Sequence, residues 1–318
     1  MNTNYPLSDF DMTEYQLGPV SYVDQSYFDI VKRIMLEGED EQDNRTHIPT
    51  RFVIGHYMQL PVHSQFPLLT TKRVFWKAAF AEMIGFIRGY NSAADFRKLG
   101  CNVWNKNANE NQQWLQNPYR KGEDHLGRIY GVQWRDWNSG TRSIDQLQKV
   151  IDDLSRDCDD RREIITAWNP GEIDLMALPP CHMTMVFSLS KQKTRVNLFV
   201  LIRSNDVFLG MPFNIAQYAF LLHLVSKMTG KQVGDLHYYA NNVHIYHSHF
   251  SQIHTQMSRI PTYNVPTLSF HREYDEMNMK QWYEFIMQYA PDEIGKIDQW
   301  VSIDNYDPHP PIKAEMAV

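Results

Sequence analysis

The chain has 318 residues, 43% of them hydrophobic and 21% charged, and its net charge is −6. This composition is typical of a globular protein, and no apolar run approaches the roughly 18 residues that a membrane-spanning helix needs. The acidic balance disfavours broad nucleic-acid binding, which needs a basic surface, although a compact basic pocket stays open. Met1 is followed by polar and acidic residues rather than by a basic patch and an apolar core, so we expect a cytoplasmic protein without a membrane partner.

The sequence contains three widely spaced cysteines, Cys101, Cys158 and Cys181. An odd number at this spacing suits neither a disulfide framework nor a zinc site. We therefore expect a reducing compartment, no metal, and at least one thiol that is free to react.

The first half of the chain predicts helices and a strand in alternation. Residues 1–24 are polar, contain two prolines and predict an irregular extension ahead of a catalytic domain over 25–318. Residues 27–35 have helical spacing and stop at Gly38, residues 52–62 predict a strand, and residues 75–89 predict a buried helix. Residues 105–128 are rich in Asn, Gln, Gly and charge, which predicts a long excursion between better-ordered parts.

The second half predicts another helix over 144–154 and two strands over 183–189 and 196–202, joined by a polar turn. A long apolar helix follows Pro212 and ends at Gly230. Strands and helices mix without a βαβ rhythm, so the pattern favours an α+β fold with one sheet. The sequence contains no Gly-rich dinucleotide or phosphate loop.

Cys181 is a candidate nucleophile, because it follows Pro179 and Pro180 and precedes an apolar strand. The two prolines preset the backbone ahead of the thiol, and Arg203 on the next strand is a candidate for the positive charge that favours a thiolate. Taken alone, the cysteine fits a small buried apolar side chain better than a nucleophile, and the nucleophile reading depends on its context.

The segment from Arg203 to Asn214 carries the groups that a nucleotide needs. Arg203 and Ser204 side by side suit a phosphate, and Asp206 with Asn214 offers donors and acceptors that could read a pyrimidine edge. Arg45, Arg161 and Arg162 add positive charge, although adjacent arginines on a loop are commonly just solvated charges. The residues alone predict a phosphate-containing ligand and a cysteine nucleophile.

Three segments resemble signatures of the thymidylate synthase family, in the family's order and at about its spacing: Cys181-His182, residues 203–214 and His244-Ile245-Tyr246. The resemblance extends from about Tyr27 to the C-terminus and includes residues 66–72, 130–131 and 306–310. It implies a single α+β domain with a large mixed sheet flanked by helices, one sheet face being used for dimerisation. It also implies transfer of a one-carbon unit from 5,10-methylenetetrahydrofolate to C5 of dUMP, without a metal or an obligatory nucleic acid.

The resemblance assigns roles position by position. Cys181 attacks C6 of dUMP, Glu82 relays protons through water to O4, and Arg161 and Arg162 complete the phosphate site of the partner in a homodimer. Burial of Glu82 on an apolar helix face is expected to raise its pKa. The catalytic set is Cys181, Glu82, Tyr130, Arg203, Asp206 and Asn214. The substrate-binding set is Arg45, Arg161, Arg162, His182, Arg203, Ser204, Asn214, His244 and Tyr246, and the folate-binding set is Trp104, Asp206, Leu209, Gly210, Phe213 and Val318.

Several positions depart from the commonest family pattern. Ile202 stands where the family usually has Gln, Asn107 replaces a second Trp, Asn44 replaces an Asp, and Asn241-Asn242 stand near a usual Gly-Asp. These changes leave the fate of the methylene intermediate open. Reduction by hydride from the folate would give thymidylate, whereas attack by water would give the product of a deoxyuridylate hydroxymethylase. Ile202 and Asn205 resemble the residues of related hydroxymethylases at these positions.

Two further questions remain at this point. A catalytically silent relative that binds nucleic acid or another partner is the alternative of a different class, and the intact catalytic set argues against it. Asn214 favours uracil over cytosine, since related enzymes that act on cytosine tend to carry Asp there. Ile202 cannot hydrogen-bond to the Asn214 amide and fix its orientation, so the sequence predicts a weaker preference than is usual in the family.

Overall fold

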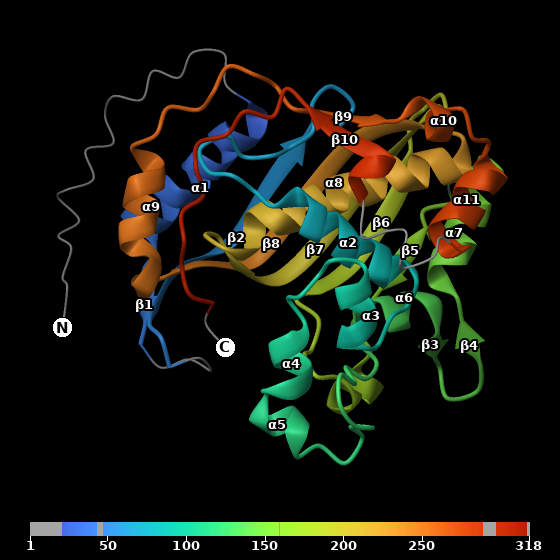
Figure 1. Cartoon of the computed structure of the whole chain (residues 1–318), viewed down its shortest axis with the longest axis horizontal. Helices are drawn as coiled ribbons and strands as arrows, with labels where there is room; N and C mark the ends of the chain where they lie inside the picture. The colour runs from blue at the N-terminus through green and yellow to red at the C-terminus, as the bar shows by residue number, and fades with distance from the viewer. Residues whose placement is uncertain (1–20, 43–46, 159, 289–296, 317–318) are drawn as a thin grey trace.

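The computed structural model describes residues 21–42, 47–158, 160–288 and 297–316. Its centre is a six-stranded sheet with the order β1-β2-β8-β7-β6-β5 (Figure 1). β7 and β8 run parallel, and the other neighbouring strands run antiparallel. The mixed sheet with flanking helices confirms the expected α+β class. The strands are β1 (Glu39–Glu41), β2 (Thr50–Leu60), β5 (Ile164–Thr166), β6 (His182–Leu189), β7 (Arg195–Asp206) and β8 (Gln232–Tyr246).

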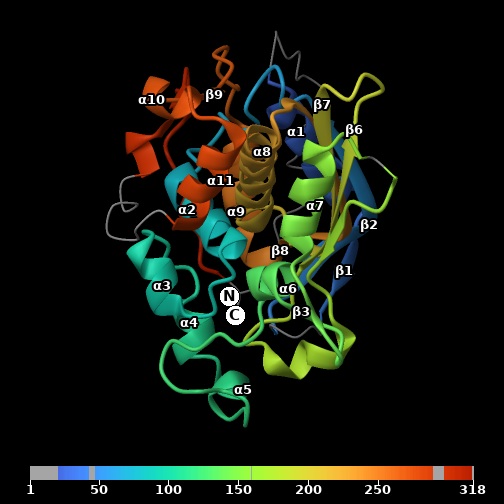
Figure 2. The same ribbon diagram turned by 90° about the vertical axis from the view of Figure 1, so that its right-hand side faces the viewer.

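Helices cover one face of this sheet and leave the other face open to solvent (Figure 2). The long helix α8 (Gly210–Thr229) packs on β7 and β8, and α1 (Tyr22–Glu37) packs on β2. Three more helices contact α8: α2 (Trp76–Ile87), α7 (Gln146–Ser155) and α11 (Met279–Gln288). Buried apolar side chains between the sheet and these helices form the core. The elements expected at 52–62, 75–89, 144–154, 183–189 and 196–202 are therefore present as β2, α2, α7, β6 and β7.

The first helix begins earlier than the sequence predicted. Ser21 caps α1 by accepting a hydrogen bond from the backbone N–H of Asp24, so residues 22–24 are helical and not part of an irregular extension. Residues 1–20 lie outside the described residues, and the domain boundary at residue 25 stays a prediction. The helix ends at Gly38 as expected, where a Cβ atom would lie 2.3 Å from the carbonyl oxygen of Ile34.

The helix expected after Pro212 begins two residues before it. Pro212 lies in the first turn of α8, where its missing N–H has no intrahelical partner to lose. Gly230 ends the helix in the left-handed region at φ 67°, as glycine commonly does. The chain then turns directly into β8, so β7, α8 and β8 form a βαβ unit that the sequence analysis did not predict.

The polar excursion over 105–128 is packed rather than extended, and in Figure 1 it projects from the body of the molecule. It holds the short helices α4 (Asn105–Asn109) and α5 (Gln112–Leu115). Trp114, on α5, is buried and donates from Nε1 to the carbonyl of His125 at 2.6 Å. Asp124 pairs with Arg97 at 2.7 Å and accepts a hydrogen bond from Asn109 at 2.8 Å.

The remaining elements surround this framework. They are α3 (Ala93–Lys98), α6 (Tyr130–Arg135), the hairpin β3 (Trp137–Asn138) and β4 (Ser143–Ile144), α9 (Phe250–Met257), β9 (Thr267–Phe270), α10 (Arg272–Asp275) and β10 (Val301–Asp304), with 3₁₀ turns at Pro170–Leu175, His247–His249 and Ile297–Gln299. β9 and β10 pair antiparallel. Within the described ranges, none of the helices has the length and apolarity to cross a membrane.

Candidate active site

Cys181 lies directly before β6, and its backbone is fixed from both sides. Its N–H donates to the hydroxyl of Tyr130 at 2.9 Å, and its carbonyl accepts the N–H of Arg203 at 2.9 Å. The Arg203 guanidinium donates to the carbonyls of Pro180 at 3.0 Å and Pro179 at 3.1 Å. The partly buried thiol is therefore carried on a segment whose position is set by β7 and α6.

Tyr130 connects this cysteine to an aromatic cluster. Its ring stacks on Phe86 at 5.0 Å and meets the edges of Trp104 at 5.7 Å and His182 at 5.4 Å. Burial, together with the nearby Cys181, raises the pKa of Tyr130 well above its ordinary value, so the hydroxyl stays protonated. Trp104 is 4% exposed and thus belongs to the wall of the site rather than to its surface.

Glu82 lies on α2 among buried neighbours. Burial raises its pKa to about 7, and the N–H donors of Gln217 and the nearby Trp104 oppose that shift only in part. Gln217 donates from Nε2 to Oε2 of this carboxylate. As the apolar helix face predicted, Glu82 can take up or release a proton near neutral pH.

A chain of hydrogen bonds continues from Gln217 to Asn214. Asn214 donates from Nδ2 to Oε1 of Gln217 at 3.4 Å and accepts at Oδ1 from Nδ2 of Asn205 at 3.0 Å. Asn205 in turn accepts from the Tyr238 hydroxyl at 2.6 Å. The sequence analysis gave no role to Gln217 or Tyr238 and noted Asn205 only as a family departure. The sequence did contain one signal for Gln217. It lies three residues after Asn214, about one helical turn away, on a largely apolar helix.

His182 lies beside this chain at the start of β6. Burial lowers its pKa to about 4, so the imidazole is neutral at pH 7. Its ring packs edge-on against Tyr218 at 5.2 Å. A neutral imidazole at this place can donate or accept a hydrogen bond without adding charge to the site.

The C-terminal ends of β7 and β8 lie side by side, in a register that brings the motif beginning at Arg203 next to the motif beginning at His244. Asp206 pairs with His244, and Ser204 pairs with Asn242. His244 is hydrogen-bonded through Nδ1 to Oδ1 of Asn242 at 2.9 Å, and its ring is perpendicular to Tyr246 at 5.2 Å. Segments about 40 residues apart in sequence are therefore adjacent along one end of the sheet.

Asp206 shapes the turn between β7 and α8. Its Oδ1 accepts the N–H groups of Phe208 at 2.8 Å and Leu209 at 3.2 Å. Lys72 donates to the carbonyl of Phe208, and its ammonium lies 3.5 Å from the centre of the Phe208 ring. Gly210 then begins α8, and Phe213, one turn further on, is partly buried against the core.

Two of the predicted site residues that the structure describes are not brought to Cys181, and two more lie outside the described residues. Arg161 and Arg162 are exposed on the loop before the edge strand β5, and Arg162 pairs only loosely with Asp160, at 3.6 Å. Arg45 and Val318 lie outside the described residues.

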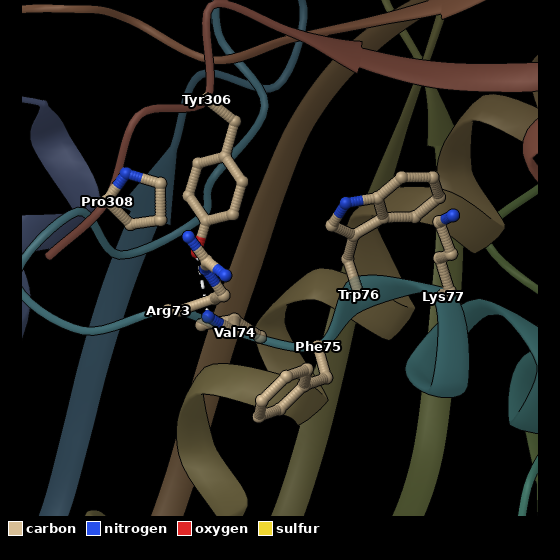
Figure 3. A pocket seen from close by; sticks show the side chains of 7 residues that line it. All are labelled: Arg73, Val74, Phe75, Trp76, Lys77, Tyr306 and Pro308. Carbon is tan, nitrogen blue, oxygen red and sulfur yellow. Dashed lines mark hydrogen bonds between the residues drawn. The ribbon is translucent and has the colours of Figure 1, made fainter. Parts of the chain in front are cut away.

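A hollow lies at the beginning of α2 and is shown in Figure 3. The same helix carries Glu82, which lies seven residues after Phe75 and therefore roughly 10 Å further along the helix axis from the hollow. Arg73 supplies positive charge and Phe75 an exposed ring, so the hollow could receive an anionic, partly aromatic ligand, whereas the ammonium of Lys77 is already paired with the Asp298 carboxylate. It is lined by Arg73, Val74, Phe75, Trp76, Lys77, Tyr306 and Pro308.

One group of described residues has metal-ligand chemistry outside this site. Ligand atoms of Cys158, Asp160 and Glu163 lie within 4.8 Å of one another on the loop before β5. Asp160 is exposed, and exposed acidic groups are common without a bound ion, so we assign no metal to this loop.

Comparison with known proteins identifies the family. A profile of the family described as thymidylate synthase matches residues 25–318. A thymidylate synthase from Bordetella parapertussis is 35% identical over 331 residues, covering 92% of this chain and 100% of the relative. Those from Idiomarina loihiensis and Shewanella halifaxensis are 40% identical (92% of this chain, 100% of the relative) and 47% identical (70% and 78%). The chain therefore belongs to the thymidylate synthase family.

Proposed function

We propose that this chain transfers a one-carbon unit from 5,10-methylenetetrahydrofolate to C5 of dUMP and reduces it to the methyl group of dTMP. The relatives described above are named thymidylate synthase, which makes this chain a one-carbon methyltransferase of the same type. The comparisons do not favour the hydroxymethylase alternative. A silent relative that only binds nucleic acid would not need a carboxyl group with a pKa near neutrality beside a cysteine site.

One observation carries the chemistry: Glu82, with its pKa of about 7, ends a hydrogen-bond chain that includes Asn214. Uracil C5 is a poor nucleophile until a thiolate adds at C6, so a covalent adduct with Cys181 activates C5 for attack on the methylene carbon. Electron density moves onto O4 when the adduct forms. Glu82 exchanges protons near neutral pH and lies on the side of the base that Asn214 reads. It can therefore stabilise the charge on O4 and later help to reverse the addition of the thiolate.

The substrate and folate assignments are part of this proposal and are supported by the match of these positions to the family's motifs. Arg203 and Ser204, with Arg45, bind the phosphate; His244 and Tyr246 bind the sugar hydroxyl; and Asn214 and His182 face the base. Trp104, Asp206, Leu209, Gly210, Phe213 and Val318 contact the folate. The guanidinium of Arg73 in the hollow suits the carboxylates at the tail of the folate.

A homodimer completes the proposal, and the helix-free sheet face supports it. Side chains of β7 alternate, so that Phe199 and Leu201 point away from the buried residues Val200 and Ile202. Phe199 pairs with Val186 and Leu201 with Tyr239, which extends this apolar surface across the sheet. An apolar sheet face of this kind marks an interaction surface, and a second copy would bring exposed Arg161 and Arg162 to the phosphate site. A cytoplasmic location stays a prediction from the sequence.

The mass of the nucleotide product tests the proposal. Purified protein is incubated with dUMP and 5,10-methylenetetrahydrofolate, and Cys181→Ser serves as the matched control. We expect dTMP together with dihydrofolate. A product heavier by one oxygen, with tetrahydrofolate released, would instead assign a hydroxymethylase, and absence of any product would reject one-carbon transfer.

A further inference from the structure

Five polar side chains from four elements form a continuous hydrogen-bonded relay through the core of the site. It runs from Tyr238 on β8 to Asn205 on β7, then to Asn214 and Gln217 on α8, and ends at Glu82 on α2. Tyr238, Asn205 and Gln217 are at most 2% exposed. Buried amides at such positions need partners, and here each partner is another member of the relay.

The direction of the relay is fixed at the Tyr238 end. Burial raises the pKa of the Tyr238 phenol well above its ordinary value, so it stays protonated and donates to Oδ1 of Asn205 at 2.6 Å. Because Oδ1 of Asn205 is engaged in this way, its Nδ2 is the group that faces Asn214. Asn205 therefore presents a donor, and Oδ1 of Asn214 turns toward it at 3.0 Å.

The contact at the Glu82 end has the same direction. Gln217 directs Nε2 toward Oε2 of Glu82, which is the only direction that the ionised form of this carboxyl group allows. Oε1 of Gln217 is then left for Nδ2 of Asn214, at 3.4 Å. Both neighbours thus hold the Asn214 amide in one orientation, and reversing it would place two acceptors together on one side and two donors together on the other.

This orientation matches uracil. Oδ1 of Asn214, beside which the His182 ring also lies, can accept from a donor such as N3–H, and Nδ2 keeps one hydrogen free for an acceptor such as O4. Cytosine offers the opposite pattern, an acceptor at N3 and an amino donor at C4. Binding cytosine would require either unmatched polar pairs or reversal of the amide against Asn205 and Gln217.

We propose that Asn205 is a positioning residue that locks the Asn214 amide in its uracil-reading orientation, with Gln217 holding the opposite side. The inference rests on the proposed function, in which Asn214 reads the base. This positioning role also changes the expectation that Ile202 weakens the preference for uracil over cytosine. The hydrogen bond that Ile202 cannot supply comes from Asn205, three residues further along the same strand, so the preference for uracil is strong and depends on Asn205.

The test is the ratio of kcat/KM for dUMP to kcat/KM for dCMP, measured in the parent, Asn205→Ala and Tyr238→Phe. In Asn205→Ala we expect the ratio to fall about tenfold, since an unmatched buried hydrogen bond weakens binding by that order. Tyr238→Phe keeps Asn205 but frees its amide to rotate, so the ratio should fall by a smaller factor. This conservative variant keeps the test decisive if Asn205→Ala does not fold.

Asn197→Ala is the matched control. Asn197 lies eight residues earlier on the same strand, roughly 26 Å away, and its side chain also makes a hydrogen bond, accepting from Asp235 N–H at 2.9 Å. Loss of general strand stability should lower both kcat/KM values together and leave their ratio unchanged. We expect that pattern in Asn197→Ala only.

The outcomes separate the two levels of the argument. If the parent makes no product from dUMP, the proposed function fails. If the parent prefers dUMP but Asn205→Ala and Tyr238→Phe retain that preference within twofold, the function stands and the positioning role is overturned. An equal fall of the ratio in Asn197→Ala would also overturn it, because the effect would not depend on contact with Asn214.

Discussion

The three thiols of this chain have different surroundings, and those surroundings predict different reactivity. Cys101 is 1% exposed, and burial raises the pKa of its thiol well above the ordinary value, so it should be inert. Cys158 lies on the loop before β5. Only Cys181 has its backbone held by both Tyr130 and Arg203. This geometry supports the proposal that Cys181 is the nucleophile.

We expect Cys181→Ser to lower kcat at least about a thousandfold while dUMP binding survives, because a hydroxyl is far less ionised than a thiol. Turnover assays and calorimetric titration with dUMP measure the two effects. Cys101→Ser and Cys158→Ser are the matched controls and should remain active. Near-normal turnover in Cys181→Ser would remove this residue from the mechanism.

Glu82 should be visible in the pH dependence of the reaction. This pKa of about 7 belongs to the free protein, so it predicts that kcat/KM of the parent changes around neutrality, and Glu82→Gln should lose that step together with a factor of about 10² to 10⁴ in kcat/KM. A pH–rate profile of both proteins over the range where they stay folded checks this. An unchanged inflection in Glu82→Gln would assign the titration to another group.

The same carboxyl group should also affect stability. In the folded chain its pKa lies near 7, above the ordinary value of 4.5, so the folded state binds more protons than the unfolded state between these values. The free energy of unfolding should therefore fall as pH rises from about 4.5 to about 7. Glu82→Gln should remove this part of the slope, which denaturant titrations at several pH values can measure.

The sequence predicted individual site residues better than their connections. Cys181, Arg203 and Asn214 stand in recognisable motifs, and the apolar helix face around Glu82 correctly indicated a raised pKa. Asn205 and Tyr238 act through contacts across β7 and β8, which no local pattern contains. Their role depends on strand register, and register is set by the packed sheet.

At the scale of elements, the loop between β2 and α2 is held from two sides. Asp24 accepts hydrogen bonds from the N–H and hydroxyl groups of Thr70 and Thr71. From the C-terminal segment, Tyr306 donates to the carbonyl of Leu69 at 3.0 Å and accepts the N–H of Val74 at 2.8 Å. These contacts fix the wall of the hollow in Figure 3.

Tyr306→Phe removes both hydroxyl contacts and keeps the ring. We expect the free energy of unfolding to fall by about 1–3 kcal/mol and KM for the folate to rise, with KM for dUMP nearly unchanged. Tyr263→Phe is the control, since Tyr263 is 71% exposed. Equal increases in both KM values would show that the hollow does not serve the folate separately.

The sequence found most helices and strands near the site but missed the central strand β8. Residues 234–241 of β8 alternate between buried and more exposed positions, but the buried set includes the small Gly234 and Ala240 and the outward set includes the aromatic Tyr239, so the contrast in apolarity along the sequence is weak. Without β8, the βαβ unit and the parallel pairing with β7 could not be predicted. Strand order is a long-range property that depends on how α8 crosses the sheet.

At the scale of the whole molecule, the two faces of the central sheet have different surroundings. Helices α1, α2, α7 and α8 lie on one side, with the site at one end of the strands, and the opposite face carries Phe199, Leu201 and Tyr57. Tyr57 is 51% exposed, and its hydroxyl is hydrogen-bonded to Nδ1 of His237 at 2.6 Å. In the proposed homodimer this face would be covered by the second copy, and the exposed Arg161 and Arg162 would serve that copy.

Shared sites make a quantitative prediction for mixed dimers. We expect Cys181→Ser and Arg162→Ala each to be nearly inactive alone, because the first lacks the nucleophile and the second a phosphate ligand. In a mixed dimer, one site combines the intact Cys181 of one subunit with the intact Arg162 of the other, and the second site has both defects. An equimolar mixture with free exchange makes half of its dimers mixed, so about one quarter of the parent activity should return.

Phe199→Asp provides the matching negative control, because a buried unpaired carboxylate on the apolar face should prevent association. Introduced into both inactive variants, it should leave the mixture inactive and the subunits monomeric in analytical ultracentrifugation. Exchange itself is followed with a mass tag on one variant. If mixed dimers form and no activity returns, Arg162 does not complete the site of the partner, and each subunit must bind the phosphate with its own residues.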